Sequence, residues 1–313
     1  IIYLSMFVEL NRPVAISQAS SPSHITGFYH KMLDSQSMLN TGSIGAGISL
    51  SHGVTTTVKI YDNVDRPTYR ISINGKLVSD AVVSNKVLDE YLKLANKSLH
   101  ISVSHETRIP IGYGLGTSGA GALSLSYALN DALCTKLSLD QAAQIAHCSE
   151  IYCNTGLGTV ISEYTGGLEL RTRAGAPGIG TAEKIPLENK SVIALCLGPM
   201  YTANCLKTQN DVFTMKALDF LKQLSKSRSV DDFLRLSHKF AVNMGAINTK
   251  CEALAELLKS KGYDCSVALF GETIFTVVSD NEIECVLQIL KNQSGHCIVS
   301  NVDNFGAKLL TNK

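Results

Sequence analysis

The 313-residue sequence predicts an α+β fold in which strands and helices form an α/β two-layer arrangement. The first observation behind this fold class is an alternation along the chain. Segments rich in β-branched residues and bounded by turn residues are followed by segments with helical periodicity. The second observation is composition, because 45% of the residues are hydrophobic and 18% are charged, which is enough for a buried core.

Glycine is concentrated in the first part of the chain. Three glycines fall in residues 41–47, five in 110–121 and seven in 156–180, and the chain after residue 180 is glycine-poor and rich in helical patterns. We therefore expect two domains, residues 1–188 and residues 189–313. The polar segment 181–191, which contains a proline, is the expected joint.

The first domain is predicted to mix strands with helices. The apolar start of the chain, residues 1–10, reads as a first strand, and the Asn74-Gly75 pair marks a turn after the third expected strand. Ser138 and Gln141 form a capping-box pattern that starts a helix running through Ala146. The other elements expected here are strands at 54–61, 69–73 and 100–106 and a helix at 122–134.

The second domain is predicted to open with a buried strand, residues 192–198, which is an uninterrupted apolar run. A turn at Gly271 is expected to divide residues 266–278 into two strands. The remaining expected elements are helices at 211–225, 230–244, 247–260 and 280–291 and a final strand at 297–302.

Composition excludes several classes of partner. Lysine and arginine total 28 against 27 acidic residues, so the net charge of +1 gives no basis for nucleic-acid or membrane-surface binding. No apolar run has the roughly 20 residues that a membrane span needs. The nine cysteines include no C-x-x-C pair, which favours reduced, mostly buried thiols in a cytoplasmic protein and argues against zinc.

The strongest local signal is a glycine-rich loop, PIGYGLGTSGAG at residues 110–121, between an expected strand and an expected helix. Glycines let the backbone approach an anion closely, and a helix N-terminus supplies unpaired N–H groups. Thr117 and Ser118 add hydroxyls for phosphate oxygens or Mg²⁺. The loop is neither a Walker A motif nor a dinucleotide-binding motif, and a tight turn without a ligand remains the alternative interpretation.

This loop resembles the P-x-x-x-G-L-G-S-S-A motif of the GHMP kinases. Further segments are similar to the archaeal pantoate kinase branch of that superfamily, in the same order along nearly the whole chain: residues 21–29, 40–54, 146–160, 165–180 and 269–275. The resemblance implies the GHMP kinase fold, with an N-terminal ATP-binding domain of the ribosomal S5 domain 2-like type and a C-terminal ferredoxin-like domain. It also implies that ATP and its acceptor meet in the cleft between them.

The resemblance also implies roles for single residues. Ser118 and Glu150 would bind Mg²⁺, as oxygen ligands suited to a hard cation. Substrate binding would fall to His24, Thr26, Arg171 and Arg173, although each arginine could equally be a solvated surface charge. The phosphates of ATP would be held by the loop residues Gly114, Leu115, Gly116, Thr117, Ser118, Gly119 and Ala120.

Two positions depart from the family pattern. Thr159 stands where the family has its catalytic Asp, and a threonine cannot ionise near neutral pH. The first motif reads Pro22-Ser23-His24, where the family has Pro-Gly followed by a basic residue or His. His24 is a candidate to replace the Asp in part, and a packed, hydrogen-bonded histidine is the alternative.

These departures favour a kinase with a shifted acceptor. The function expected first is an ATP-dependent phosphotransferase acting on a primary hydroxyl of a branched hydroxycarboxylate, namely mevalonate 3-phosphate, in the archaeal mevalonate route of isoprenoid biosynthesis. The alternatives are pantoate kinase, in coenzyme A biosynthesis, and a catalytically inactive homologue that binds nucleotide. The expected cofactors are ATP and Mg²⁺, and the resemblance allows a homodimer.

Overall fold

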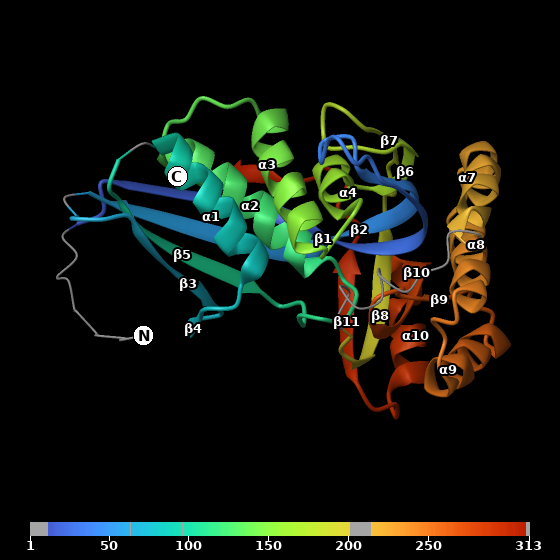
Figure 1. The fold of residues 1–313 in the computed structure, drawn as a ribbon. Helices are drawn as coiled ribbons and strands as arrows, with labels where there is room; N and C mark the ends of the chain where they lie inside the picture. Colours follow the sequence, from blue (N-terminus) through green and yellow to red (C-terminus); the bar gives the residue numbers. More distant parts are fainter. Residues whose placement is uncertain (1–11, 63, 96, 201–213, 311–313) are drawn as a thin grey trace.

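The computed structural model describes residues 12–62, 64–95, 97–200 and 214–310, and this part of the chain folds around two β-sheets (Figure 1). The first sheet has the strand order β12-β1-β2-β5-β3-β4, and β6 extends it by pairing with both β2 and β7. Its strands are β1 (Ala15–Met32), β2 (Gly42–Tyr61), β3 (Thr68–Ile73), β4 (Lys76–Val78), β5 (His100–Thr107), β6 (Leu168–Arg173), β7 (Thr181–Ile185) and β12 (Lys308–Leu310).

Strands β1 and β2 form a long antiparallel pair that reaches from one half of the molecule into the other (Figure 1). Their register shifts between Pro22 and Ser23 and again between Thr26 and Phe28. Before these irregularities β1 carries Ala19 into the core beneath the helices of the first sheet, and after them it carries Phe28 into the core of the second half. The sequence analysis did not predict either strand at this length.

Helices α1 (Val82–Ala95), α2 (Thr117–Ala132) and α3 (Leu139–Cys153) cover one face of the first sheet (Figure 1). Alternate residues of β2 and β5, such as Val58 and Val103, point toward these helices and are buried, as the two-residue period of a strand requires. Ser138 caps α3 and forms the predicted capping box with Gln141. The short helix α4 (Thr159–Thr165) follows α3 and precedes β6.

The second sheet has the strand order β11-β8-β10-β9 and carries helices on both faces. Ala194 packs with the helices α7 and α8 and with β1, whereas its neighbours Ile193 and Leu195 pack with α9 and α10. The elements are β8 (Lys190–Gly198), β9 (Ser266–Val267), β10 (Glu272–Ser279), β11 (His296–Asn301), α7 (Lys216–Ser227), α8 (Val230–Asn243), α9 (Thr249–Ser260), α10 (Ile283–Leu290) and the 3₁₀ turn η1 (Asp280–Glu282).

This architecture confirms the predicted fold class, a mixed α+β protein built on two sheets. Within the expected joint at 181–191, residues 181–185 form β7, which pairs with β6. The expected strand at 1–10 lies outside the described residues. Of the eight described cysteines none is paired, but only three are buried, two are half-buried and three are exposed, so the expectation that they are mostly buried is wrong. None of the described helices has the length and apolar content needed to cross a bilayer.

Candidate active site

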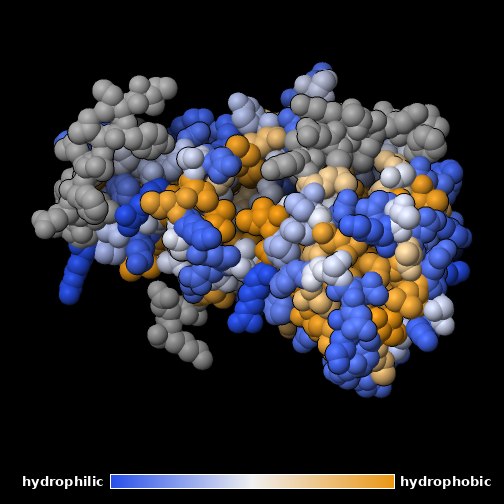
Figure 2. Space-filling model, turned by 90° about the horizontal axis from the view of Figure 1, so that it is seen from below, coloured by the Kyte–Doolittle hydropathy of each residue, from blue (hydrophilic) through white to orange (hydrophobic). Residues whose placement is uncertain are grey.

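A cavity of about 590 Å³ lies between the glycine loop and residues of the second half of the molecule, among them Pro199 and Phe270. Its lining is mixed. The glycine loop, Glu150 and residues 155–159 contribute most of the polar groups, and Ile73, Val78 and Val82 are among the apolar side chains. Figure 2 shows hydrophobic side chains exposed near the middle of the face seen from below, and Val82 and Ile111 are both more than half exposed.

The glycine loop leads directly into the N-terminus of α2. Gly112, Gly114 and Gly116 have φ of 88°, 76° and 70°, which is left-handed backbone that glycine adopts without strain. Gly116 is the residue before the helix, and no side chain caps the first turn. The N–H groups of that turn are therefore available to an anion, as the sequence predicted for this segment.

The segment around Gly271 holds the loop from the other side. A methyl group on Gly271 would lie 2.2 Å from the carbonyl carbon of Tyr113, so only glycine allows this approach. Thr273 donates a hydrogen bond of 2.8 Å from Oγ1 to the carbonyl oxygen of Tyr113. Residues 269–273, which the sequence analysis related to a family motif, thus fix the shape of the phosphate loop.

Ser118 and Glu150 meet at the start of α2. The Ser118 hydroxyl donates to Glu150 Oε1 at 2.5 Å, and the Thr155 hydroxyl donates to the same oxygen at 2.7 Å. Burial raises the pKa of Glu150, whose side chain is almost fully enclosed. A hydroxyl and a carboxylate in contact are hard oxygen donors of the kind that Mg²⁺ prefers, so these residues fit the cation that the sequence implied.

Thr159 lies beside this pair, at the first position of α4. It lines the cavity, and a methyl group on Gly119 would lie 2.8 Å from its Cγ2. The position that the family gives to its catalytic Asp is therefore next to the first turn of α2. The side chain present there is an alcohol.

His24 is one of the residues that line the cavity, and its side chain belongs to a buried ionic network. Its Nε2 lies 3.1 Å from Glu169 Oε2, and both side chains are essentially inaccessible to solvent. Arg171 Nη1 also binds Glu169 and donates to Ser162 Oγ at 2.6 Å. Because the imidazole is engaged by Glu169, the geometry favours the packed, hydrogen-bonded histidine over a base that replaces the Asp.

Arg171 turns one unpaired group toward the cavity wall. Its Nε is buried without a hydrogen-bond partner. A methyl group on Gly158 would lie 2.9 Å from this Nε and 2.3 Å from Ser43 Oγ. Ser43 and Gly158 both line the cavity. A buried guanidinium N–H without a partner costs free energy, so it is a candidate to bind a ligand oxygen.

The other two residues predicted to bind substrate differ in position. Thr26 lines the cavity. Arg173 is exposed and is not part of the cavity lining. The pairing of β6 with β7 shifts between Arg171 and Arg173, and this irregularity breaks the alternation that would otherwise give the two arginines the same face.

Glu163 is a further acidic residue at the site that the sequence analysis did not single out. Its side chain is completely buried, and neither carboxyl oxygen has a hydrogen-bond partner. A methyl group on Gly116 or on Gly119 would lie 2.8 Å or 2.7 Å from these oxygens, so the carboxyl group lies directly under the phosphate loop. The pKa of Glu163 is raised well above its usual value, mainly by burial and secondly by the negative charges of Glu150 and Glu169.

Three functional candidates, Ser43, Glu163 and Glu169, were missed although the sequence held a signal for two of them. Glu163 is four residues after Thr159 in a helical segment, which places both on one face. Glu169 and Arg171 are two apart in a strand and therefore share a side of the sheet. Ser43 had no signal of its own inside its glycine-rich segment.

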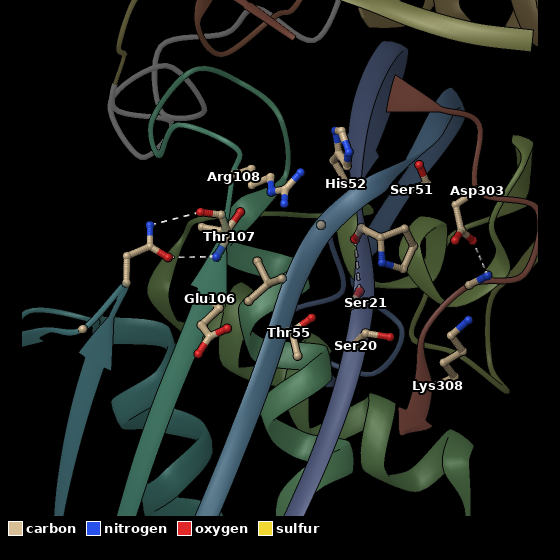
Figure 3. Close-up of a pocket in the computed structure, with 16 residues that line it drawn as sticks. Ser20, Ser21, Ser51, His52, Thr55, Glu106, Thr107, Arg108, Asp303 and Lys308 are labelled. Atoms are coloured by element: carbon tan, nitrogen blue, oxygen red, sulfur yellow. Dashed lines mark hydrogen bonds between the residues drawn. The ribbon is translucent and has the colours of Figure 1, made fainter. Parts of the chain in front are cut away.

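A second cavity of about 700 Å³ lies against the open part of the first sheet (Figure 3). Arg108 and Lys308 contribute positive charge to its lining, and Glu106 and Asp303 contribute negative charge. Figure 3 shows these four side chains around the hollow. The mixed charges give no cradle for a polyphosphate, so the cavity at the glycine loop is the candidate active site.

Comparison with known proteins agrees with this choice. The family model described as the GHMP kinases N terminal domain matches residues 79–167, which contain the glycine loop, Glu150 and Thr159. Pantoate kinase of Methanocaldococcus jannaschii is 35% identical over 87% of this chain and 96% of that relative. Pantoate kinase of Thermococcus kodakarensis is 30% identical over 88% of this chain and 92% of that relative.

Solved structures extend the similarity to the whole fold. A phosphotransferase described as related to the CoA biosynthesis pathway superposes with a TM-score of 0.84 at 27% identity, covering 94% of this chain and 98% of its own. A mevalonate diphosphate decarboxylase from Enterococcus faecalis superposes with a TM-score of 0.74 at 15% identity, covering 95% of this chain and 99% of its own. The second likeness concerns the fold alone.

Proposed function

The chain belongs to the GHMP kinases, in the pantoate kinase branch, and from this membership we propose that it transfers the γ-phosphoryl group of ATP to the primary hydroxyl of pantoate. Membership makes the chain an ATP-dependent kinase, and the choice of acceptor is the proposal. It reverses the order expected from the sequence, where a mevalonate phosphate came first. The relatives and the charges of the cavity both favour pantoate and coenzyme A biosynthesis.

The observation that carries the proposal is the single buried guanidinium of Arg171. Its unpaired Nε faces Ser43 and Gly158 in the cavity wall. One arginine beside one hydroxyl suits the carboxylate of a small hydroxy acid. Glu169 and Ser162 hold the rest of the guanidinium group, which keeps this N–H in place for the acceptor.

The same lining argues against a phosphorylated acceptor. No lysine or arginine occurs among the described residues that line the cavity, so the Nε of Arg171, next to the lining residue Gly158, is the one cationic group described at this wall. Mevalonate 3-phosphate would bring a second, doubly charged group beside the ATP phosphates, and its burial without a cation would be unfavourable. Arg173, the other arginine expected to bind substrate, is exposed and lies outside the lining.

The chemistry follows from the groups around the glycine loop. The acceptor hydroxyl oxygen forms a bond to the γ-phosphorus while the bond from phosphorus to the β–γ bridging oxygen breaks, and the hydroxyl proton leaves to solvent or phosphate. The N–H groups of the loop and of the first turn of α2 stabilise the phosphate charge. Ser118 and Glu150 would hold Mg²⁺, which when bound neutralises charge on the phosphate oxygens.

A threonine at position 159 is compatible with turnover. Phosphoryl transfer depends chiefly on positioning and on charge stabilisation, and its transition state is loose, so a general base contributes less than in acyl transfer. If Thr159 has no proton-transfer role, Thr159→Ala retains kcat within about threefold. A loss of 10²-fold, typical of removing a general acid or base, would contradict this account.

Product analysis on an acceptor panel tests the proposal. The purified protein is incubated with ATP and Mg²⁺ and either pantoate, mevalonate 3-phosphate, mevalonate, pantothenate or homoserine, and products are identified by mass. We expect phosphopantoate as the principal product. A bisphosphate formed only from mevalonate 3-phosphate would restore the acceptor first expected, and nucleotide binding without any product would favour the inactive homologue.

A further inference from the structure

Four hydrogen-bonding side chains run in a chain from the cavity into the core between the first sheet and its helices. Ser84 on α1 lines the cavity, and its Oγ lies 3.1 Å from Nε2 of His105 on β5. Nδ1 of His105 lies 2.8 Å from Oγ1 of Thr56 on β2, which lies 2.6 Å from Oγ of Ser124 on α2. All four side chains are at least nine-tenths buried, and the sheet and the helix layer that carry them pack together in Figure 1.

The hydrogen bond made by Ser124, at the buried end of this row of side chains, determines where each proton in the row lies. Ser124 Oγ is 2.7 Å from the carbonyl oxygen of Ala120, and because a carbonyl only accepts, Ser124 must donate its one proton there. Thr56 therefore donates to Ser124 and accepts from Nδ1–H of His105. Nε2 of the neutral imidazole is then an acceptor, and it takes the proton of Ser84.

The state of His105 supports this arrangement. Burial lowers the pKa of His105 to about 4, so the ring is neutral at neutral pH and has one donor and one acceptor nitrogen. Ser84 has no other hydrogen-bond partner given by the structure. Since its proton is committed to His105, its oxygen offers the cavity lone pairs and no donor.

The surroundings of Ser84 fit a flat heteroaromatic ring. Val82 and Val83 line the cavity from α1, next to Ser84, together with Asp80 just before the helix. Ile73 lines it from β3, where it pairs with His105, and Val78 lines it from β4. These elements face the same cavity as the glycine loop, so a nucleotide whose phosphates lie at the loop would place its base against these apolar side chains. Among these apolar neighbours, a hydroxyl fixed as an acceptor would favour a base that presents an N–H at its edge.

We propose that Ser84 is a specificity-determining residue that accepts a hydrogen bond from the 6-amino group of adenine, and that His105, Thr56 and Ser124 are positioning residues that keep it an acceptor. This inference rests on the proposed function in one respect, namely that the phosphoryl donor is a purine nucleotide bound at the glycine loop. A base with a 6-oxo group would bring two acceptors together at Ser84 and would bind less well.

Nucleotide preference measures this directly. The ratio of kcat/KM for ATP to that for inosine triphosphate should exceed about tenfold in the unsubstituted protein. Ser84→Ala should lower the ratio about five- to tenfold, mainly by raising KM for ATP. Purine riboside triphosphate, which lacks the 6-substituent, should be used equally well by both proteins.

Substitutions of Thr56 distinguish a role in positioning the Ser84 proton from a role in packing alone. Thr56→Val removes the acceptor for Nδ1–H, so the imidazole proton can move to Nε2 and Ser84 becomes free to donate. The ATP preference should fall, and Thr56→Ser should restore it. The matched control is Ser126→Ala, which removes another buried hydroxyl of α2, bonded to Tyr91 and to the carbonyl of Ala142, and should leave the ratio unchanged.

Calorimetric binding of ADP and inosine diphosphate gives the same ratio without an acceptor alcohol. A mistaken choice of pantoate therefore leaves this test intact. Equal affinity for the two diphosphates, or an unchanged ratio in Ser84→Ala, overturns the assignment of Ser84 while the kinase function stands. Failure to bind either nucleotide would overturn both.

Discussion

Gly116 belongs to the glycine loop and packs against the buried carboxyl group of Glu163 and the backbone of His24. Gly116→Ala therefore tests whether the loop needs left-handed backbone and this close packing. At φ of 70° an alanine costs about 1–2 kcal/mol because its Cβ crowds the following carbonyl. The new methyl would also lie 2.8 Å from Glu163 Oε1 and 2.9 Å from the backbone N and O of His24. His24 N donates to the carbonyl of Leu115, so this backbone cannot move aside freely, and overpacking adds about 1–3 kcal/mol.

A matched variant at Gly75 separates the cost of overpacking from the cost of backbone strain. Gly75 has φ of 78°, and nothing lies within 4 Å of a methyl group placed there. Gly75→Ala should therefore lose only the 1–2 kcal/mol of backbone strain. The entropy that alanine removes from the unfolded chain is the same in both variants and cancels in the comparison.

Urea unfolding and steady-state kinetics together give the readout. Gly116→Ala should unfold at a urea concentration about 0.5–1 M lower than Gly75→Ala, and its KM for ATP should rise tenfold or more because the loop N–H groups move. Gly75→Ala should keep the KM of the unsubstituted protein. Equal unfolding midpoints and an unchanged KM in both variants would refute the packing of the loop on Glu163 and His24.

Further predictions concern the charged groups. Ser118→Ala and Glu150→Gln should each lower kcat about 100-fold or more with a weaker response to added Mg²⁺, and an unaltered Mg²⁺ titration of kcat would remove the metal assignment. Burial raises the pKa of Glu163, so as the pH rises this group loses its proton in the unfolded protein before it does so in the folded protein. The free energy of unfolding should therefore fall by about 1.4 kcal/mol per pH unit between the unfolded pKa near 4.5 and the higher folded pKa. Urea midpoints at pH 5, 6 and 7 should decline less in Glu163→Gln, and parallel declines would contradict this. Arg171→Met leaves Glu169 buried without its guanidinium and should cost about 3–5 kcal/mol, measured as a lower thermal midpoint, which Arg171→Lys should restore in part.

Local signals in the sequence predicted local structure well. The capping box at Ser138 and Gln141 forms as expected, because both hydrogen bonds join residues three apart. Asn74 and Gly75 adopt φ of 48° and 78° in the turn between β3 and β4, as the Asn-Gly pair indicates. Such features depend on neighbours in the sequence and need no knowledge of the fold.

The long strands β1 and β2 could not be predicted in the same way. Their sequences contain a proline, several serines and closely spaced glycines, which are residues typical of loops. What holds them extended is their mutual pairing from Ala15–Ile60 to Met32–Gly42. That pairing is a tertiary property, and it overrides local preference.

The same distinction between local and long-range features applies to the candidate site. The meeting of Ser118 and Glu150 was expected only because the motifs around them resemble a known family, since 32 residues separate them. The contact of His24 with Glu169 spans 145 residues and had no counterpart in the resemblance. Composition and periodicity carry no information on such a contact, because it depends on how β1 crosses the sheet.

Strand β12 gives the molecule a particular order of assembly. Its three residues pair with Gln18, Ala19 and Ser20 of β1, so the edge of the first sheet is completed by a segment that is synthesised after every strand of the second sheet. Until then β1 exposes an unpaired edge throughout synthesis of the second half. A fragment ending near residue 188 would keep that edge open, and we expect it to associate with other chains more readily than the chain that includes β12 does.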